Sequence, residues 1–249
     1  MSHSKDDEYY IKDINLTDRI KITDQYVAIV DNDTVIVADI HLGFESVLNE
    51  YGVSLPRFEL HEVMEKFTKL LTDYPIKRII LNGDFKHDFS KNSDSEWNEI
   101  TQFLNRILTS IDEIILVKGN HDNFLSTIAY RMGVTVVDYY DIGNITVFHG
   151  DRSTERDERI IIGHEHPSIT FRDRIGAMYT MPIYLFFRSS EILVLPAFSA
   201  WTYGSDVLRY PLTSPVIRNK NIDEAEVYGI YENGIVDLTT IKNIKKLIR

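Results

Sequence analysis

The sequence predicts an α/β fold in which two mixed β-sheets pack as a sandwich with helices on the outside. Three observations lead to this prediction. Short runs of β-branched residues recur along the 249-residue chain, as is typical of buried strands. Two amphipathic helical patterns separate the early strands, and the later half of the chain consists of strands with little helix between them.

The first half alternates between strands and helices, which indicates βαβ units. Apolar residues at three- and four-residue spacing form one apolar stripe in each of two helices, predicted near residues 60–71 and 97–108. The strands expected around them span residues 26–30, 34–38, 78–81, 113–117, 135–137, 145–148 and 160–162.

The second half is predicted to contain strands at 183–187, 191–195, 226–231 and 235–240. The last two are separated by Glu232-Asn233-Gly234, which is typical of a hairpin turn. We expect one domain over residues 1–249, with flexible polar segments at about 1–20 and 219–226. The basic tail from Lys242 is interpreted as a solvated helix end.

The composition is that of a globular protein, with 43% hydrophobic and 26% charged residues. The formal charge is 27 − 38 = −11, so binding to DNA would need a local basic patch. The absence of cysteine excludes disulfides, thiolate metal sites and cysteine nucleophiles. Residues 1–10 lack an apolar signal segment, and Arg188 and Glu191 interrupt the longest apolar stretch. We therefore expect a cytoplasmic protein without membrane association.

Five short segments carry residue types that bind metal ions, and each follows a predicted strand. In α/β sheets, ligand sites gather beyond the carboxyl ends of the strands, where loops from several strands converge. The five segments together make a chance origin improbable. They are Asp39-Ile40-His41, Gly83-Asp84, Gly119-Asn120-His121-Asp122, His149-Gly150 and Gly163-His164-Glu165-His166.

The first two segments offer ligands for cations. Strand alternation places Asp39 and His41 on the same side, so that both can bind one cation. Asp84 follows a glycine that permits a sharp turn, and its carboxylate can bridge two metals. Taken singly, each segment is weak, because an Asp-x-His pair arises by chance and an Asp after a strand is often a turn residue.

The segment from Gly119 is more specific. Asn120 offers a neutral oxygen ligand, His121 a titratable proton donor, and Asp122 a carboxylate that can orient the imidazole. The alternative is that Asn120 and Asp122 cap the next helix, which leaves His121 unexplained. In the last segment, His164 and His166 lie on one side of an extended stretch.

The ordered set of D-x-H, G-D, G-N-H-[DE], H and G-H-x-H resembles the calcineurin-like metallophosphoesterase family, and the resemblance runs from Asp39 to Pro167. It implies a four-layer α/β sandwich with two divalent metal ions and a phosphate ester substrate. Asp84 would bridge the metals. The resemblance implies one metal held by Asp39, His41, Asp84 and His166, and a second held by Asp84, Asn120, His149 and His164.

Several motifs look most like the ICC-like phosphoesterases of archaea and bacteria, which include ligase-associated DNA damage response endonucleases. They are Asp39-Ile40-His41-Leu42-Gly43, Gly83-Asp84-Phe85-Lys86-His87, Gly163-His164-Glu165-His166-Pro167 and Leu195-Pro196-Ala197-Phe198-Ser199. This likeness favours phosphodiesters and makes nucleic acid a candidate substrate.

The expected reaction is attack on the phosphate ester by a metal-bridging hydroxide, while His121, positioned by Asp122, protonates the leaving alkoxide. The mixed ligand set favours Mn²⁺, with Fe²⁺ or Zn²⁺ as alternatives.

Two other functions stay open: hydrolysis of small nucleotides or metabolites, which suits the acidic surface, and a non-catalytic scaffold, which the matching ligands disfavour. The oligomeric state and the role of His87 also stay open. The loop with Arg152, Arg156 and Arg159 is interpreted as a solvated mixed-charge loop, with contacts to a phosphodiester as the alternative.

Overall fold

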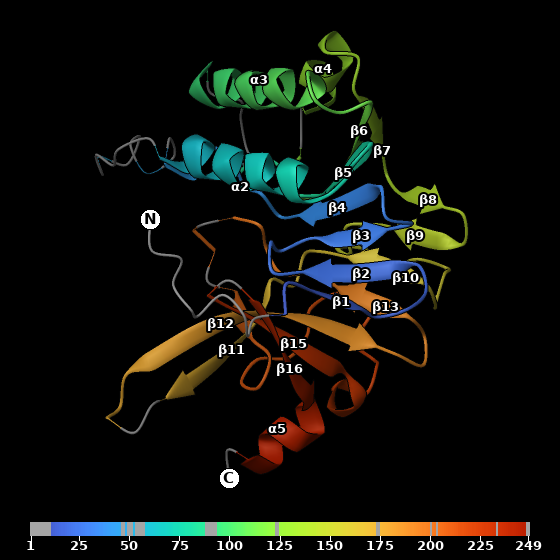
Figure 1. Cartoon of the computed structure of the whole chain (residues 1–249), viewed down its shortest axis with the longest axis vertical. Coiled ribbons are helices and arrows are strands. Elements are labelled where there is room, and N and C mark those ends of the chain that lie inside the picture. The colour runs from blue at the N-terminus through green and yellow to red at the C-terminus, as the bar shows by residue number, and fades with distance from the viewer. Residues whose placement is uncertain are drawn as a thin grey trace.

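The structure, a computed structural model, describes residues 11–45, 48, 52, 58–87, 94–122, 125–172, 175–199, 201–202, 204–232 and 234–247. Its elements form four layers in the order helices, sheet, sheet, helix (Figure 1). The prediction of a four-layer sandwich of two mixed sheets with flanking helices is therefore confirmed.

The first sheet has the strand order β1-β2-β3-β4-β5-β6-β7. Strands β1 to β4 are antiparallel, whereas β4 to β7 are parallel. Ala38 pairs with Asn82, and Asn82 with Val117, so the carboxyl ends of three strands lie level. The strands are β1 (Asp13–Asn15), β2 (Ile20–Thr23), β3 (Ala28–Val30), β4 (Thr34–Ala38), β5 (Arg78–Asn82), β6 (Glu113–Val117) and β7 (Thr135–Val137).

The second sheet follows the order β14-β11-β12-β13-β10-β9-β8, and β15 and β16 extend it from β12. Strand β10 is parallel to β9 and β13. The register of Tyr231 with Gly234 confirms the hairpin predicted at 232–234. The strands are β8 (Tyr140–Ile142), β9 (Ile145–Val147), β10 (Ile160–Ile162), β11 (Pro167–Arg172), β12 (Met178–Phe187), β13 (Ile192–Val194), β14 (Ser205–Asp206), β15 (Glu226–Tyr231) and β16 (Gly234–Thr240).

Alternation along the strands divides the apolar residues among three cores. On β4, Val35 and Val37 face the core under the helices, whereas Ile36 and Ala38 face the core between the sheets. A third core lies under α5 (Ile241–Leu247), and Ile241 of this helix belongs to it. The helices that cover the first sheet are α2 (Glu59–Asp73), α3 (Asp94–Leu108) and α4 (Leu125–Arg131).

A buried hydrogen bond ties the two sheets together. The Tyr184 hydroxyl of β12 is fully buried and donates to the Thr23 carbonyl of β2 at 2.8 Å. At the far end, the turn η1 (Ile222–Glu224) falls within the segment expected to be flexible, and Asp223 there pairs with Lys245 of α5 at 2.6 Å. Within the part of the chain that the structure describes, no helix is long and apolar enough to cross a bilayer.

Candidate active site

The five metal-binding segments come together where the strand ends of the two sheets meet. The Asn82 side chain at the end of β5 donates to the Phe148 carbonyl beyond β9 at 3.1 Å. The His164 amide beyond β10 donates to Asp39 Oδ2 beyond β4 at 2.9 Å. These bonds cross from one sheet to the other, so segments distant in sequence share one site.

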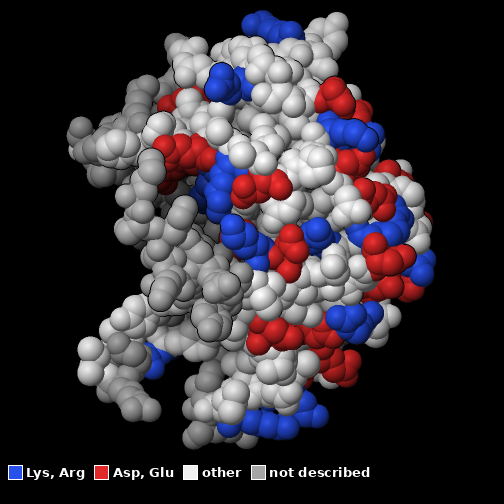
Figure 2. Space-filling model, viewed as in Figure 1, with Lys and Arg blue, Asp and Glu red and all other residues white. Residues whose placement is uncertain are grey.

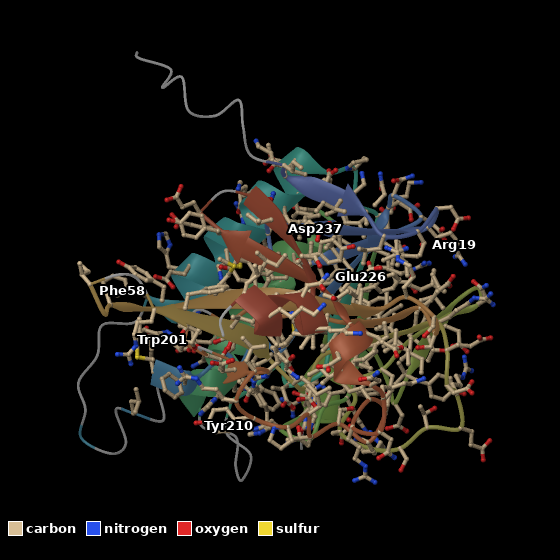
Figure 3. All side chains as sticks on the ribbon, turned by 90° about the horizontal axis from the view of Figure 1, so that it is seen from below. Arg19, Phe58, Trp201, Tyr210, Glu226 and Asp237 are labelled. Carbon is tan, nitrogen blue, oxygen red and sulfur yellow. The ribbon has the colours of Figure 1, made fainter. Side chains whose placement is uncertain are left out.

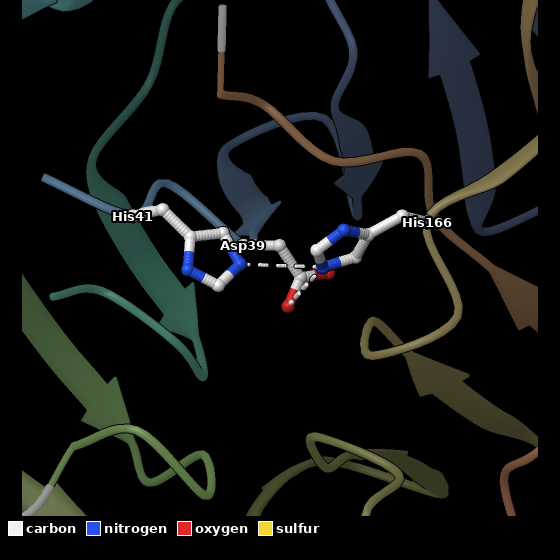
Figure 4. Close-up of side chains that lie close together, drawn as sticks. All are labelled: Asp39, His41 and His166. Atoms are coloured by element: carbon white, nitrogen blue, oxygen red, sulfur yellow. Dashed lines mark hydrogen bonds and ion pairs between the residues drawn. The ribbon is translucent and has the colours of Figure 1, made fainter. Parts of the chain in front are cut away.

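The first donor group consists of Asp39, His41 and His166, whose ligand atoms all lie within 4.8 Å of one another. His166 Nε2 lies 3.3 Å from His41 Nε2 and 3.4 Å from Asp39 Oδ1 (Figure 4). Two imidazole nitrogens and a carboxylate oxygen therefore converge on one point. Donors this close together can hold one cation.

The second donor group consists of Asp84, His149 and His164. His149 Nε2 lies 3.4 Å from Asp84 Oδ2 and 3.1 Å from Asn120 Oδ1, so the amide oxygen joins this group. His149 Nδ1 lies 3.6 Å from Asp39 Oδ1. The two donor groups therefore adjoin each other. The bridging role of Asp84 that the family resemblance implies stays a prediction.

The residues fit bound cations. Among the described residues, Asp39 Oδ1, His41 Nδ1 and His149 Nδ1 are buried without a hydrogen-bond partner. A buried polar atom that lacks a partner costs about 1–3 kcal/mol. Coordination of a cation would give Asp39 Oδ1 a partner, and the mixed carboxylate, imidazole and amide donors suit Mn²⁺, Fe²⁺ or Zn²⁺.

The electrostatics of the site also favour cations. Burial lowers the pKa of His41 to about 3, so this imidazole is neutral and able to bind a metal. Burial opposes charge on His149, yet the hydrogen bond to Asp84 and the charge of Asp39 raise its pKa to about 9. Burial would raise the pKa of Asp84, but His149 lowers it below its usual value. The protonated His149 supplies positive charge that a cation would replace.

The backbone turns sharply at the ligands. Positive φ angles are unfavourable for non-glycine residues and cluster at functional sites. Glycines between the ligands make room for these turns: a Cβ on Gly83 would lie 2.0 Å from His149 Nδ1, and one on Gly163 would lie 2.5 Å from Asp39 Oδ2. The ligands with positive φ are Asp39 (56°), His41 (54°), Asp84 (43°), His164 (67°) and His166 (42°).

His121 lies at the same site. Its Nδ1 lies 3.0 Å from the His87 carbonyl oxygen, and its ring is 5.5 Å from that of His41. A carbonyl only accepts hydrogen bonds, so Nδ1 is the donor in this contact. The Asp122 carboxylate accepts hydrogen bonds from the backbone amides of Phe85, Lys86 and Gly119, and the expectation that it also orients His121 stays a prediction.

Asp122 joins the loop after β5 to the loop after β6. Its side chain is buried, and this burial raises its pKa to about 6 although the amides of Gly119 and Lys86 act in the opposite direction. The backbone carbonyl of His87, a residue whose role the sequence left open, contacts the imidazole of His121.

Glu165 is a further positioning residue that sequence reasoning missed. It lies between the two histidines of the last segment, and its Oε1 accepts hydrogen bonds from the Thr213 amide at 2.8 Å and from the Ser214 amide. The Ser214 hydroxyl in turn donates to the Gly150 carbonyl at 2.6 Å. Through Ser214, these contacts connect the segment of His164 to Gly150, the residue that follows His149. The sequence around Glu165 does not indicate this role, because Thr213 and Ser214 lie far from it along the chain.

The arginines after His149 pair with acidic side chains. Arg152 lies 3.5 Å from Asp138, Arg156 2.7 Å from Asp141, and Arg159 3.2 Å from Glu191. Their side chains are 43–49% exposed. These contacts support the interpretation of a solvated mixed-charge loop.

The sequence model of the calcineurin-like phosphoesterases matches residues 33–225, and the chain belongs to this family. A comparison with curated protein sequences gave no match. Among solved structures, the nuclease MPE of Pseudomonas putida has the same fold, with a TM-score of 0.66 and 17% identity, over 91% of this chain and 98% of that chain. Two others give lower TM-scores: AQ665 of Aquifex aeolicus, of unknown function (0.33, 22% identity, 57% of this chain and 81% of that chain), and Vps29 of Chaetomium thermophilum (0.28, 9% identity, 80% and 81%).

Substitution of Gly83 tests whether the second donor group binds metal. We expect Gly83→Ala to abolish the stabilisation of the protein by Mn²⁺, because the added methyl would displace His149. Gly133→Ala is the matched control: its φ of 69° is close to the 75° of Gly83, but nothing lies within 4 Å of the added methyl. Thermal unfolding with and without Mn²⁺ measures both variants. Equal stabilisation of both by Mn²⁺ would contradict this role of His149.

Proposed function

We propose that the protein is a two-metal phosphoesterase that hydrolyses phosphodiesters, with His121 as general acid. The observation that carries the proposal is the pair of adjoining donor groups: Asp39 Oδ1 of the first lies 3.4 Å from His166 Nε2 of the same group and 3.6 Å from His149 Nδ1 of the second. Membership of the calcineurin-like phosphoesterases supports the reaction class. Mn²⁺ is the proposed metal, in keeping with the mixed oxygen and nitrogen donors.

The proposed roles follow from the positions of the side chains. Asp39, His41, Asp84 and His166 would hold one cation, and Asp84, Asn120, His149 and His164 the other. Two bound cations supply Lewis-acid activation of water and neutralise charge on the phosphoryl group. His121, held at Nδ1 by the His87 carbonyl, would deliver the proton at Nε2 to the leaving oxygen.

The proposed acid role makes the effect of His121→Asn depend on the leaving group. An alkoxide needs a proton as it departs, whereas p-nitrophenolate needs little help. We therefore expect a loss of about 10²- to 10⁴-fold in kcat on an alkyl phosphodiester and a much smaller loss on a p-nitrophenyl ester. Steady-state kinetics on both esters measure the effect. The acid role is wrong if both rates fall by the same factor.

The choice of substrate rests on two further points. The likeness of the motifs to ICC-like phosphoesterases favours a diester, and the structural neighbour from Pseudomonas putida is a nuclease. The net charge of −11 instead favours small nucleotides or metabolites. Figure 2 shows acidic and basic side chains interspersed over one face, which gives a polyanion no broad basic surface on that face.

A comparison of esters separates these substrates. We expect Mn²⁺-dependent hydrolysis of a phosphodiester to exceed that of the corresponding monoester. If single-stranded DNA is cleaved, its KM should rise steeply with salt, because binding to phosphates releases counterions. Turnover of small diesters without cleavage of any nucleic acid would exclude the nuclease, and a preference for monoesters would exclude the diester proposal.

A further inference from the structure

A short loop that carries Trp201 is fixed at both ends to the first donor group. The Ser199 amide donates to the Asp39 carbonyl at 3.2 Å, and the Ser205 amide donates to the His166 carbonyl at 2.8 Å. Gly204 packs so closely that a Cβ there would lie 2.3 Å from the His166 carbonyl oxygen. Trp201 is therefore held beside the metal ligands, on the side of the molecule away from Arg19 (Figure 3).

Aromatic rings connect this loop to the donor group. The ring of His41 lies 5.6 Å from that of His87, His87 lies 4.7 Å from Phe44, and Phe44 lies 6.0 Å from Trp201. The last two rings are tilted by 36°, so their faces point in similar directions. Phe44 and Trp201 are only half-buried, so part of each side chain is open to solvent.

These two rings differ from the aromatic residues that fill the interior. Phe67, Phe103 and Phe198 are at most 1% exposed and belong to the core under the helices. Among the described residues, the three cores and the side chains packed against them include neither Phe44 nor Trp201. Among the described residues, the aromatic neighbours of this pair are therefore each other and His87 and not the side chains of a core.

We propose that Phe44 and Trp201 form a stacking subsite for a nucleobase of the nucleotide next to the scissile phosphate. This inference rests on the proposed phosphodiesterase function and gives it a substrate class. Stacking of a base on an aromatic side chain strengthens binding by about ten- to a hundred-fold and tolerates any sequence. It requires no positive charge, which suits a chain with a net charge of −11.

The kinetic test compares thymidylyl-thymidine with the same diester lacking both bases. The ratio of kcat/KM for the two diesters measures recognition of the base alone. We expect Trp201→Ala to lower this ratio about ten-fold or more, mainly through KM, and Trp201→Phe to restore most of it. Trp97→Phe on α3 is the control and should leave the ratio unchanged. An unchanged ratio in Trp201→Ala would overturn the subsite.

A binding test keeps the subsite separate from the reaction. In the Trp97→Phe variant, Trp201 is the remaining tryptophan of the two in the sequence. Thymidine 5′-monophosphate should quench its fluorescence, whereas deoxyribose 5-phosphate should not. Quenching without turnover of any diester would refute the proposed function and retain the subsite, and equal responses to both ligands would refute the subsite.

Discussion

The face-to-face packing of the two sheets is the constraint on which the site depends. Ile36, Ile80 and Ile115 of the first sheet share one buried core with Ile161 and Leu193 of the second. This core fixes the carboxyl ends of β4, β5 and β6 opposite those of β9 and β10. None of the five loops holds a complete donor group by itself, so the ligand positions follow from the contact between the sheets.

The same packing also buries ionisable groups, and their burial costs free energy. Asp39 and His149 are both fully buried, and burial of a charge is tolerated only when it is paired or bound to a metal. Positive φ angles at Asp39 and His41 add backbone strain. Metal binding would offset both costs, which couples the stability of the loops to the occupancy of the site.

Most strands next to the site were predictable because each is a short β-branched run that ends at a polar motif. Strand β14 consists of Ser205 and Asp206, and β1 has one apolar residue, Ile14, between Asp13 and Asn15, so neither is a β-branched run. The first half of β12, from Met178, is exposed and depends on pairing with β11. Helix α4 has seven residues, which is too short for a clear apolar stripe.

The residue types that can bind metal were predictable because each belongs to a short motif that directly follows a strand. The contacts that position these residues were not predictable, because they join segments far apart in the sequence. The carboxylate of Asp122 accepts hydrogen bonds from the amides of Phe85 and Lys86 in another loop, and no pattern in the sequence indicates these contacts. Glu165 likewise contacts Thr213 and Ser214, which only the folded chain brings near.

The central claim is that two adjacent donor groups bind two cations. A crystal of the protein grown with excess Mn²⁺ and measured at the manganese absorption edge tests it most directly. Two anomalous peaks are predicted, one among Asp39, His41, Asp84 and His166, and the other among Asp84, Asn120, His149 and His164. A single peak, or none at these residues, would contradict it.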